Sequence, residues 1–280
     1  FPTVSSDSNL EMIDYLANWL DSSGARVDVF HDETGTKANL FATLGPEVDG
    51  GIVLSGHTDV VPALEADCTN DPFDMIKRDG KLFGRGSCDM KGFFALAIEA
   101  AKHFLDQPLK QPLIILATAD EESSMSGARA LSDAARPKAR HAIIGEPTGL
   151  VPCIDHYGYY ECRMTVQGAR AHAALPEMGA SAIHAMLAWM QLILESGAEA
   201  SHGLTISPRQ ISGGAGLFMV AQECEAAIDI HAPPGVDNNV IDALIEQART
   251  AAQATHPRCE LRFEQLYWAT GYTNPVDDPQ

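Results

Sequence analysis

Several acidic residues and one histidine follow apolar runs of the sequence, at places where strands would end. In a mostly parallel sheet the carboxyl ends of the strands share one edge, and ligands bind beyond that edge. We therefore expect these side chains to lie close together in the folded chain. The residues are His57, Asp59, Glu121, Glu122 and Glu146.

A further acidic residue, Asp89, stands just before a stretch with helical spacing. Its carboxylate could simply cap that helix. Its two oxygens could instead bridge two metal ions, which lie about 3.5–4 Å apart in two-metal hydrolytic sites. Histidine with carboxylates is a ligand set that zinc accepts. The pattern therefore predicts metal ligands at His57, Asp89, Glu122 and Glu146.

The remaining acidic residues suggest supporting roles. Adjacent residues point in different directions, so Glu122 can bind metal while Glu121 takes a proton from water. Asp59 lies two residues after His57 and shares its face of the strand, where it can accept a hydrogen bond from the ring. Taken singly, each motif could also be an ordinary turn or a solvated loop.

Composition argues against several kinds of partner. The chain carries 19 Lys and Arg against 38 Asp and Glu, a net charge of −19. Nucleic acids and anionic membranes attract basic surfaces, so we expect neither as a partner. No apolar run reaches the length of about 18 residues that a membrane span needs, and the first residues do not resemble a secretory signal. The six cysteines form no C-x-x-C pair, which predicts reduced thiols in the cytoplasm.

Strand-like and helical stretches alternate in the first half of the chain. This alternation predicts a mostly parallel sheet with helices on both faces. The spacing of apolar residues predicts an opening helix near 10–20, capped by one of residues 6–8, and helices over 89–105 and 126–134. The predicted strands are 25–30, 38–44, 51–55, 112–118 and 141–145.

The pattern changes near residue 157. From there the order of elements is β-α-β-β-α-β, which is typical of a ferredoxin-like domain. We expect a catalytic domain over 1–156 and an inserted domain over 157–267, with the return to the first domain beginning near 268–280. The predicted elements are strands 160–166, 204–211, 221–231 and 259–265, and helices 181–194 and 240–254.

The motifs together resemble a family of cocatalytic zinc amidohydrolases and peptidases. That family includes acetylornithine deacetylase, succinyl-diaminopimelate desuccinylase, aminoacylase and glutamate carboxypeptidase. The resemblance runs over nearly the whole chain and implies an α/β fold, with a three-layer α/β/α catalytic domain and an inserted ferredoxin-like domain through which two copies dimerise. The segments that carry it are 1–10, 37–44, 80–94, 116–129 and 143–148.

The resemblance also implies a ligand set and a reaction. His57, Asp89 and Glu146 would hold one zinc ion, and Asp89 would bridge to a second ion on Glu122, giving two per subunit. Cobalt or manganese could replace zinc. The reaction would remove the acyl group of a small N-acylated amino acid, above all N2-acetyl-L-ornithine, yielding L-ornithine and acetate for arginine biosynthesis.

Three further residues receive roles from the resemblance. Glu121 would be the general base and then the proton donor to the leaving amine. Asp59 would orient His57, and His172 would polarise the scissile carbonyl. The peptide bond after Asp89 would be cis.

The sequence departs from the family pattern in three respects. The histidine expected near the C-terminus for the second metal has no counterpart, because His256 falls in the inserted domain; we expect residues to be missing at both ends. Phe218 stands where the family has an asparagine, and His231 where it has an arginine. A related desuccinylase, aminoacylase or dipeptidase therefore remains an alternative, and an inactive truncated homologue is a second one.

Overall fold

The computed structural model describes residues 1–63, 70–104, 107–199, 203–214 and 216–275. The chain divides into two compact units, Phe1–Val151 and Pro152–Gln280. Position 105, where the predicted second helix would end, and positions 276–280, the last of the predicted return segment, lie outside the described residues, as does Cys68.

The first unit is built on a five-stranded sheet in the order β1-β2-β6-β3-β7. Strand β3 runs parallel to β6 and β7, whereas β2 is antiparallel to both β1 and β6. The sheet is therefore mixed: β2 alone runs against the other four strands, and the prediction of a mostly parallel sheet is confirmed apart from that strand. A short turn joins β1 to β2, and such a connection allows only antiparallel pairing. The strands are Arg26–His31 (β1), Ala38–Leu44 (β2), Ile52–His57 (β3), Leu113–Thr118 (β6) and His141–Ile144 (β7).

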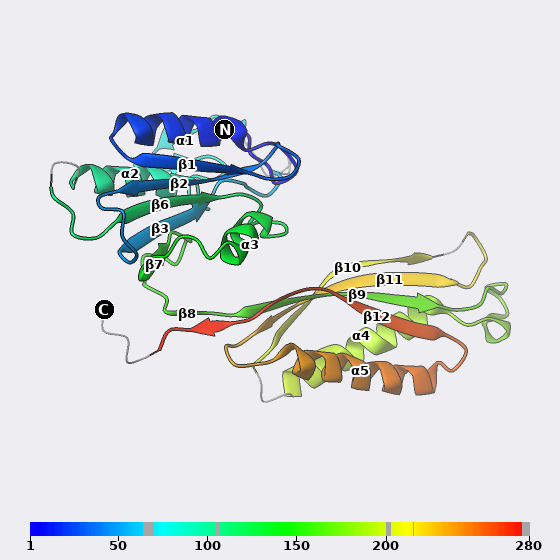
Figure 1. The fold of residues 1–280 in the computed structure, drawn as a ribbon. Helices are drawn as coiled ribbons and strands as arrows, with labels where there is room; N and C mark the ends of the chain where they lie inside the picture. Colours follow the sequence, from blue (N-terminus) through cyan, green and yellow to red (C-terminus); the bar gives the residue numbers. More distant parts are fainter. Residues whose placement is uncertain (64–69, 105–106, 200–202, 215, 276–280) are drawn as a thin grey trace. The chain divides into compact units, whose positions relative to one another are not determined.

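Helices cover both faces of this sheet. Helices α1 (Leu10–Ser22) and α2 (Gly92–Lys102) share one apolar core with it, and α3 (Ser126–Asp133) packs on the opposite face through Leu131 (Figure 1). The three-layer α/β/α arrangement is therefore confirmed. Buried residues of the first core include Ile13, Leu16, Leu20, Leu40, Phe94 and Ile115.

The N-cap of helix α1 is not one of the predicted residues 6–8 but the residue after them. Asn9 is the N-cap residue, and it makes no side-chain capping bond within the helix. Its buried amide Nδ2 instead donates to the carbonyl of Ala38 and to Oγ1 of Thr58, each at 2.8 Å, while its Oδ1 accepts from the amide of Ala38 at 2.9 Å. Asn9 thus ties the start of the helix to β2 and to the residue that follows His57.

The second unit is a four-stranded antiparallel sheet in the order β10-β11-β9-β12. Helices α4 (Ala182–Glu199) and α5 (Asn238–Thr255) both lie on one face of it (Figure 1). The chain order β9-α4-β10-β11-α5-β12 confirms the ferredoxin-like plan. The strands are Gly158–Gln167 (β9), Thr205–Gly214 (β10), Glu223–Ala232 (β11) and Glu260–Ala269 (β12).

Four short strands were not predicted. Strands β4 (Ile76–Arg78) and β5 (Lys81–Phe83) form a small hairpin, and β8 (Asp155–His156) pairs with β13 (Tyr272–Thr273). The second pair brings the chain that enters β9 beside the chain that leaves β12. No helix within the described part of the chain is long and apolar enough to cross a membrane.

Candidate metal centre

The register of the parallel strands brings the predicted metal-site residues to one edge of the first sheet. His57 is the last residue of β3 and lies opposite Thr118, the last residue of β6. Ser55 lies opposite Ile144, the last residue of β7. Glu121 and Glu146 follow β6 and β7 within three residues, so both reach the edge where His57 ends its strand.

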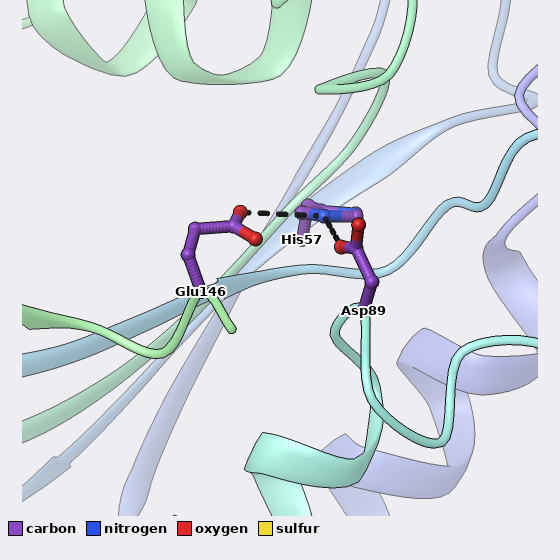
Figure 2. Close-up of side chains that lie close together, drawn as sticks. All are labelled: His57, Asp89 and Glu146. Atoms are coloured by element: carbon purple, nitrogen blue, oxygen red, sulfur yellow. Dashed lines mark hydrogen bonds and ion pairs between the residues drawn. The ribbon is translucent and has the colours of Figure 1, made fainter. Parts of the chain in front are cut away.

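The imidazole of His57 lies at the centre of this group. Its Nε2 is 3.1 Å from Oδ1 of Asp89, 3.5 Å from Oε1 of Glu146 and 3.8 Å from Oε2 of Glu121. One ligand atom each from His57, Asp89 and Glu146 lies within 4.8 Å of the others. Figure 2 shows the carboxylates of Asp89 and Glu146 turned toward the His57 ring. Asp89 precedes α2, and the peptide bond between Asp89 and Met90 is cis.

The other ring nitrogen of His57 fixes the tautomer. Nδ1 lies 2.9 Å from the backbone carbonyl oxygen of Asp59 and 3.5 Å from Oδ1 of the same residue. Both are acceptors, so the neutral ring carries its hydrogen on Nδ1. The shorter contact is to the backbone, although the carboxylate was the partner we had expected. The lone pair of Nε2 is left facing Asp89 and Glu146, as a metal ligand requires.

The buried carboxylate of Asp59 holds the loop that follows β6. Its side chain is 1% exposed and accepts hydrogen bonds from the Ser5 hydroxyl at 2.7 Å and from the backbone amides of Glu121 and Glu122 at 3.0 and 3.2 Å. Burial raises the pKa of Asp59, but the hydrogen bonds from His57, Ser5 and the Glu121 amide outweigh it and lower the pKa. Asp59 therefore stays ionised and keeps both glutamates in place.

The carboxylates at this edge crowd one another. Burial, followed by the charges of Asp89, Glu121 and Glu122, raises the pKa of Glu146 to about 7. The pKa values of Glu121 and Glu122 are raised as well, mainly by burial. Burial lowers the pKa of His57, but the surrounding carboxylates raise it to about 9. Carboxylates this close together cannot all stay ionised without a positive charge among them. A proton supplies that charge in the metal-free protein, and a metal ion supplies it when one binds.

The donor set fits a zinc ion. One imidazole nitrogen and two carboxylates converge, and zinc binds nitrogen and oxygen donors of these types. His57 is 1% exposed, whereas Asp89 and Glu146 are 51% and 37% exposed, so the ligands are anchored on one side and open to solvent on the other. Glu122 lies outside the converging group, and Asp89 is the neighbouring charge that most raises its pKa.

Gly145 allows β7 to deliver Glu146 to this point. A Cβ atom at residue 145 would lie 2.1 Å from Cγ of the Phe93 ring in α2 and within 2.5 Å of two more ring atoms. Any side chain there would have to push aside the ring of Phe93, which belongs to the helix that follows Asp89. Close packing of strand end against helix thus sets the distance between Glu146 and Asp89.

His172 belongs to the second unit, where it is exposed. Its Nδ1 accepts a hydrogen bond from the amide of Ala174 at 3.1 Å, and its ring stacks on Phe218 at a centroid distance of 6.3 Å. Phe218 adopts a left-handed backbone conformation with φ of 63°. His231, on β11 of the same unit, lies 5.3 Å from the ring of Tyr159.

Three residues beside the His57 group were missed by the sequence reasoning. Ser5 contacts Asp59, and Lys37 forms an ion pair with Asp120, the residue before Glu121. All three lie in segments that carried the resemblance, 1–10, 37–44 and 116–129, which is the signal the sequence offered. Nothing in the spacing of Ser5 or Asp120 distinguished them from ordinary loop residues.

Comparison with known proteins agrees with this geometry. Residues 53–266 match the model of peptidase family M20/M25/M40. An acetylornithine deacetylase of Proteus mirabilis (strain HI4320) is 38% identical over 284 residues, which cover 96% of this chain and 72% of the relative. The fold is similar to that of aminopeptidase PepT from Bacillus cereus, with a TM-score of 0.71 and 21% identity over 98% of this chain and 75% of the other.

A dinuclear metal-binding peptidase of the M20 family from Bacillus subtilis also shares the fold, with a TM-score of 0.69 and 14% identity over 98% of this chain and 72% of the other. The family match, the identity to the Proteus relative and the converging metal ligands lead to one conclusion. The chain belongs to peptidase family M20/M25/M40 and is a metal-dependent hydrolase.

Proposed function

We propose that this hydrolase removes the acyl group from a small N-acylated amino acid, and that its substrate is N2-acetyl-L-ornithine. The observation that carries the proposal is the convergence of His57, Asp89 and Glu146 beside Glu121. The 38% identity to an acetylornithine deacetylase supports this choice of substrate within the family. The products would be L-ornithine and acetate.

In this proposal His57, Asp89 and Glu146 hold the first metal ion. Zinc is the expected metal, and cobalt or manganese could occupy the same ligands. Glu122 would serve a second ion, with Asp89 between the two. When bound, the metal polarises the substrate carbonyl and lowers the pKa of a water molecule.

Glu121 moves the proton. Its Oε2 lies 3.8 Å from Nε2 of His57, so it borders the space in front of the ligands without belonging to the converging group. Its backbone amide is held by Asp59, and burial raises its pKa, which favours a group that must both accept and release a proton. Glu121 would take a proton from the attacking water and deliver it to the amine nitrogen as the amide bond breaks.

His172 and the two positions that depart from the family pattern would contact the substrate. Nδ1 of His172 accepts a hydrogen bond from the Ala174 amide, so the neutral ring carries its proton on Nε2. That N–H could donate to the carbonyl oxygen of the substrate. Phe218 and His231 would adjust which acyl group and which amino acid are accepted.

The same proposal extends to the architecture. Residues 1–156 would form the catalytic domain and 157–267 an inserted domain that joins two copies into a homodimer. Strand β10 lies at an edge of its sheet, where it can pair with another strand. Cys88, Cys162, Cys224 and Cys259 are free thiols, which suits a cytoplasmic protein. Light scattering at micromolar concentration tests the dimer.

The test of the proposed function is an assay of the purified chain reconstituted with Zn²⁺ or Co²⁺. N-acetyl-L-ornithine is compared with N-succinyl-diaminopimelate, N-acetyl-L-methionine and a dipeptide, each by release of free amine. We expect the highest kcat/KM for N-acetyl-L-ornithine. Glu121→Gln should lower kcat by about 10²–10⁴-fold while metal still binds, and the exposed Glu99→Gln on α2 should not.

A higher kcat/KM for one of the other three substrates would replace the substrate in this proposal by that class. No hydrolysis of any of them by metal-loaded protein would favour the inactive homologue.

A further inference from the structure

A set of buried polar contacts ties three loops together beside the His57 group. The opening segment of the chain pairs with the residues after β3, because the Val60 amide donates to the Thr3 carbonyl at 3.0 Å and the Ser5 amide donates to the Val60 carbonyl at 3.1 Å. This pairing brings the Ser5 hydroxyl to Oδ2 of Asp59, at 2.7 Å.

The Ser5 hydroxyl completes the surroundings of a fully buried carboxylate. The other donors to Asp59 are backbone amides, at 3.0 Å from Glu121 and 3.2 Å from Glu122, together with Nδ1 of His57 at 3.5 Å. Ser5 is therefore the hydroxyl that fixes how the Asp59 carboxylate turns. The same carboxylate lies against Nδ1 of His57 and accepts from the Glu121 amide, so its orientation bears on both.

Lys37 connects the same segment to the turn that carries the glutamates. Its Nζ donates to the Ser5 carbonyl at 2.7 Å and lies 2.7 Å from Oδ1 of Asp120, and the two charged side chains are only 12% and 15% exposed. The second contact is an ion pair without hydrogen-bond alignment. Asp120 also accepts a hydrogen bond from the Ser126 hydroxyl at 2.9 Å, and its backbone is left-handed with φ of 59°.

A left-handed aspartate at this point reverses the chain immediately before Glu121. The Asp120 carbonyl accepts from the amides of Ser124 and Met125 at 3.1 and 2.7 Å, which closes the turn. Lys37 thus holds the turn at one end and the Ser5 segment at the other. Removing either partner of this largely buried ion pair would leave an uncompensated charge, which is costly.

We propose that Ser5 and Lys37 are positioning residues of the metal site: Ser5 holds Asp59, and through it His57, while Lys37 locks the Asp120 turn that presents Glu121. Neither side chain would touch metal or substrate. The inference rests on the proposed function, since it assigns partners to the residues that the proposal places at the metal. Partners of this kind usually change metal affinity or activity by about 10–100-fold when removed.

The test is a titration of metal-free protein with Co²⁺, followed by the visible absorption of the bound ion. Ser5→Ala should weaken Co²⁺ binding by about 10-fold or more and change the spectrum, and Ser5→Thr, which keeps the hydroxyl, should restore most of the affinity. Lys37→Met should lower kcat by about 10-fold or more with KM nearly unchanged. Ser22→Ala in α1 and Lys102→Met in α2, both exposed, are the matched controls.

Wild-type Co²⁺ affinity and spectrum in Ser5→Ala would overturn the role of Ser5, and so would an equal loss in Ser5→Thr. Unchanged kcat in Lys37→Met would overturn the role of Lys37. If that variant does not fold, Lys37→Gln, which can still reach the Ser5 carbonyl without the charge, decides by the same criterion.

The titration also separates this inference from the proposed function. A wild-type chain that binds Co²⁺ but cleaves none of the test substrates contradicts the proposed reaction. The spectra of the Ser5 variants still decide the positioning role. A wild-type chain that binds no Co²⁺ contradicts both.

Discussion

Metal binding should displace protons from this site in a number that the structure sets. In the metal-free protein the crowded carboxylates raise the pKa of His57 to about 9, and burial with neighbouring carboxylates raises that of Glu146 to about 7. At pH 7 His57 is then almost fully protonated and Glu146 about half protonated. The first metal ion needs both groups without their protons, so it should release about 1.5 protons at pH 7.

The number should change with pH in a definite direction. Near pH 6 Glu146 is mostly protonated and the release rises toward about 2, and near pH 8 it falls toward about 1, from His57 alone. Because protons compete with the metal throughout this range, the apparent affinity must increase as pH rises. Its logarithm should climb with a slope of about 1.5 per pH unit near pH 7.

Calorimetric titration with Zn²⁺ in buffers of different ionisation enthalpy measures this quantity directly. The control is His103→Asn, which changes an exposed histidine at the end of α2 and should leave the count as it is. Release close to zero at pH 7, or an affinity that does not depend on pH between 6 and 8, would refute the assignment of His57 and Glu146 as ligands.

Three substitutions test other parts of the structure. Gly145→Ala should destabilise the first unit by about 1–3 kcal/mol in thermal unfolding and weaken metal binding, because its Cβ would lie 2.1 Å from Phe93; an unchanged midpoint would contradict the packing. Asp59→Asn should weaken metal binding by about 10–100-fold in Co²⁺ titration, since it removes the charge behind His57; wild-type affinity would count against that role. Trp189→Ala should cost the second unit about 3–5 kcal/mol in denaturant unfolding, whereas the half-exposed Leu187→Ala in the same helix should cost far less.

The spacing of apolar residues predicted where the strands lie, but not that β2 runs antiparallel to its neighbours. Strand β2 was placed at residues 38–44, where it is observed, because its apolar run is bounded by polar turns on both sides. The antiparallel entry of β1 and β2 was not foreseen, since apolar spacing is the same for a parallel and an antiparallel strand. The second unit was predicted well because strand and helix patterns alternate there in a distinctive order.

Part of the metal site could be predicted from the sequence because several of its residues lie at the ends of strands. His57, Glu121 and Glu146 each follow an apolar run closely, and a shared sheet edge brings such residues together. Asp89 was harder to assign, because an acidic residue before a helix can be only a cap, and it was singled out together with the other three ligands rather than alone. How close Glu146 comes depends on the packing of Gly145 against Phe93, which no local pattern reveals.

The supporting contacts could not be predicted from local sequence. Ser5 and Asp59 are 54 residues apart, and they meet only because the opening segment pairs with Val60. Lys37 looks like any charged turn residue until the fold buries it against Asp120. Such contacts arise from tertiary packing, so their residues carry no periodic signal.

Anomalous diffraction at the zinc absorption edge, from crystals of the Zn²⁺-loaded chain, tests the central claim most directly. We predict a peak about 2.0–2.2 Å from Nε2 of His57 and from a carboxylate oxygen of Asp89 and of Glu146. A crystal of zinc-loaded protein with no peak among these three residues, or with its peaks elsewhere, would contradict the metal centre and the hydrolytic function proposed for it.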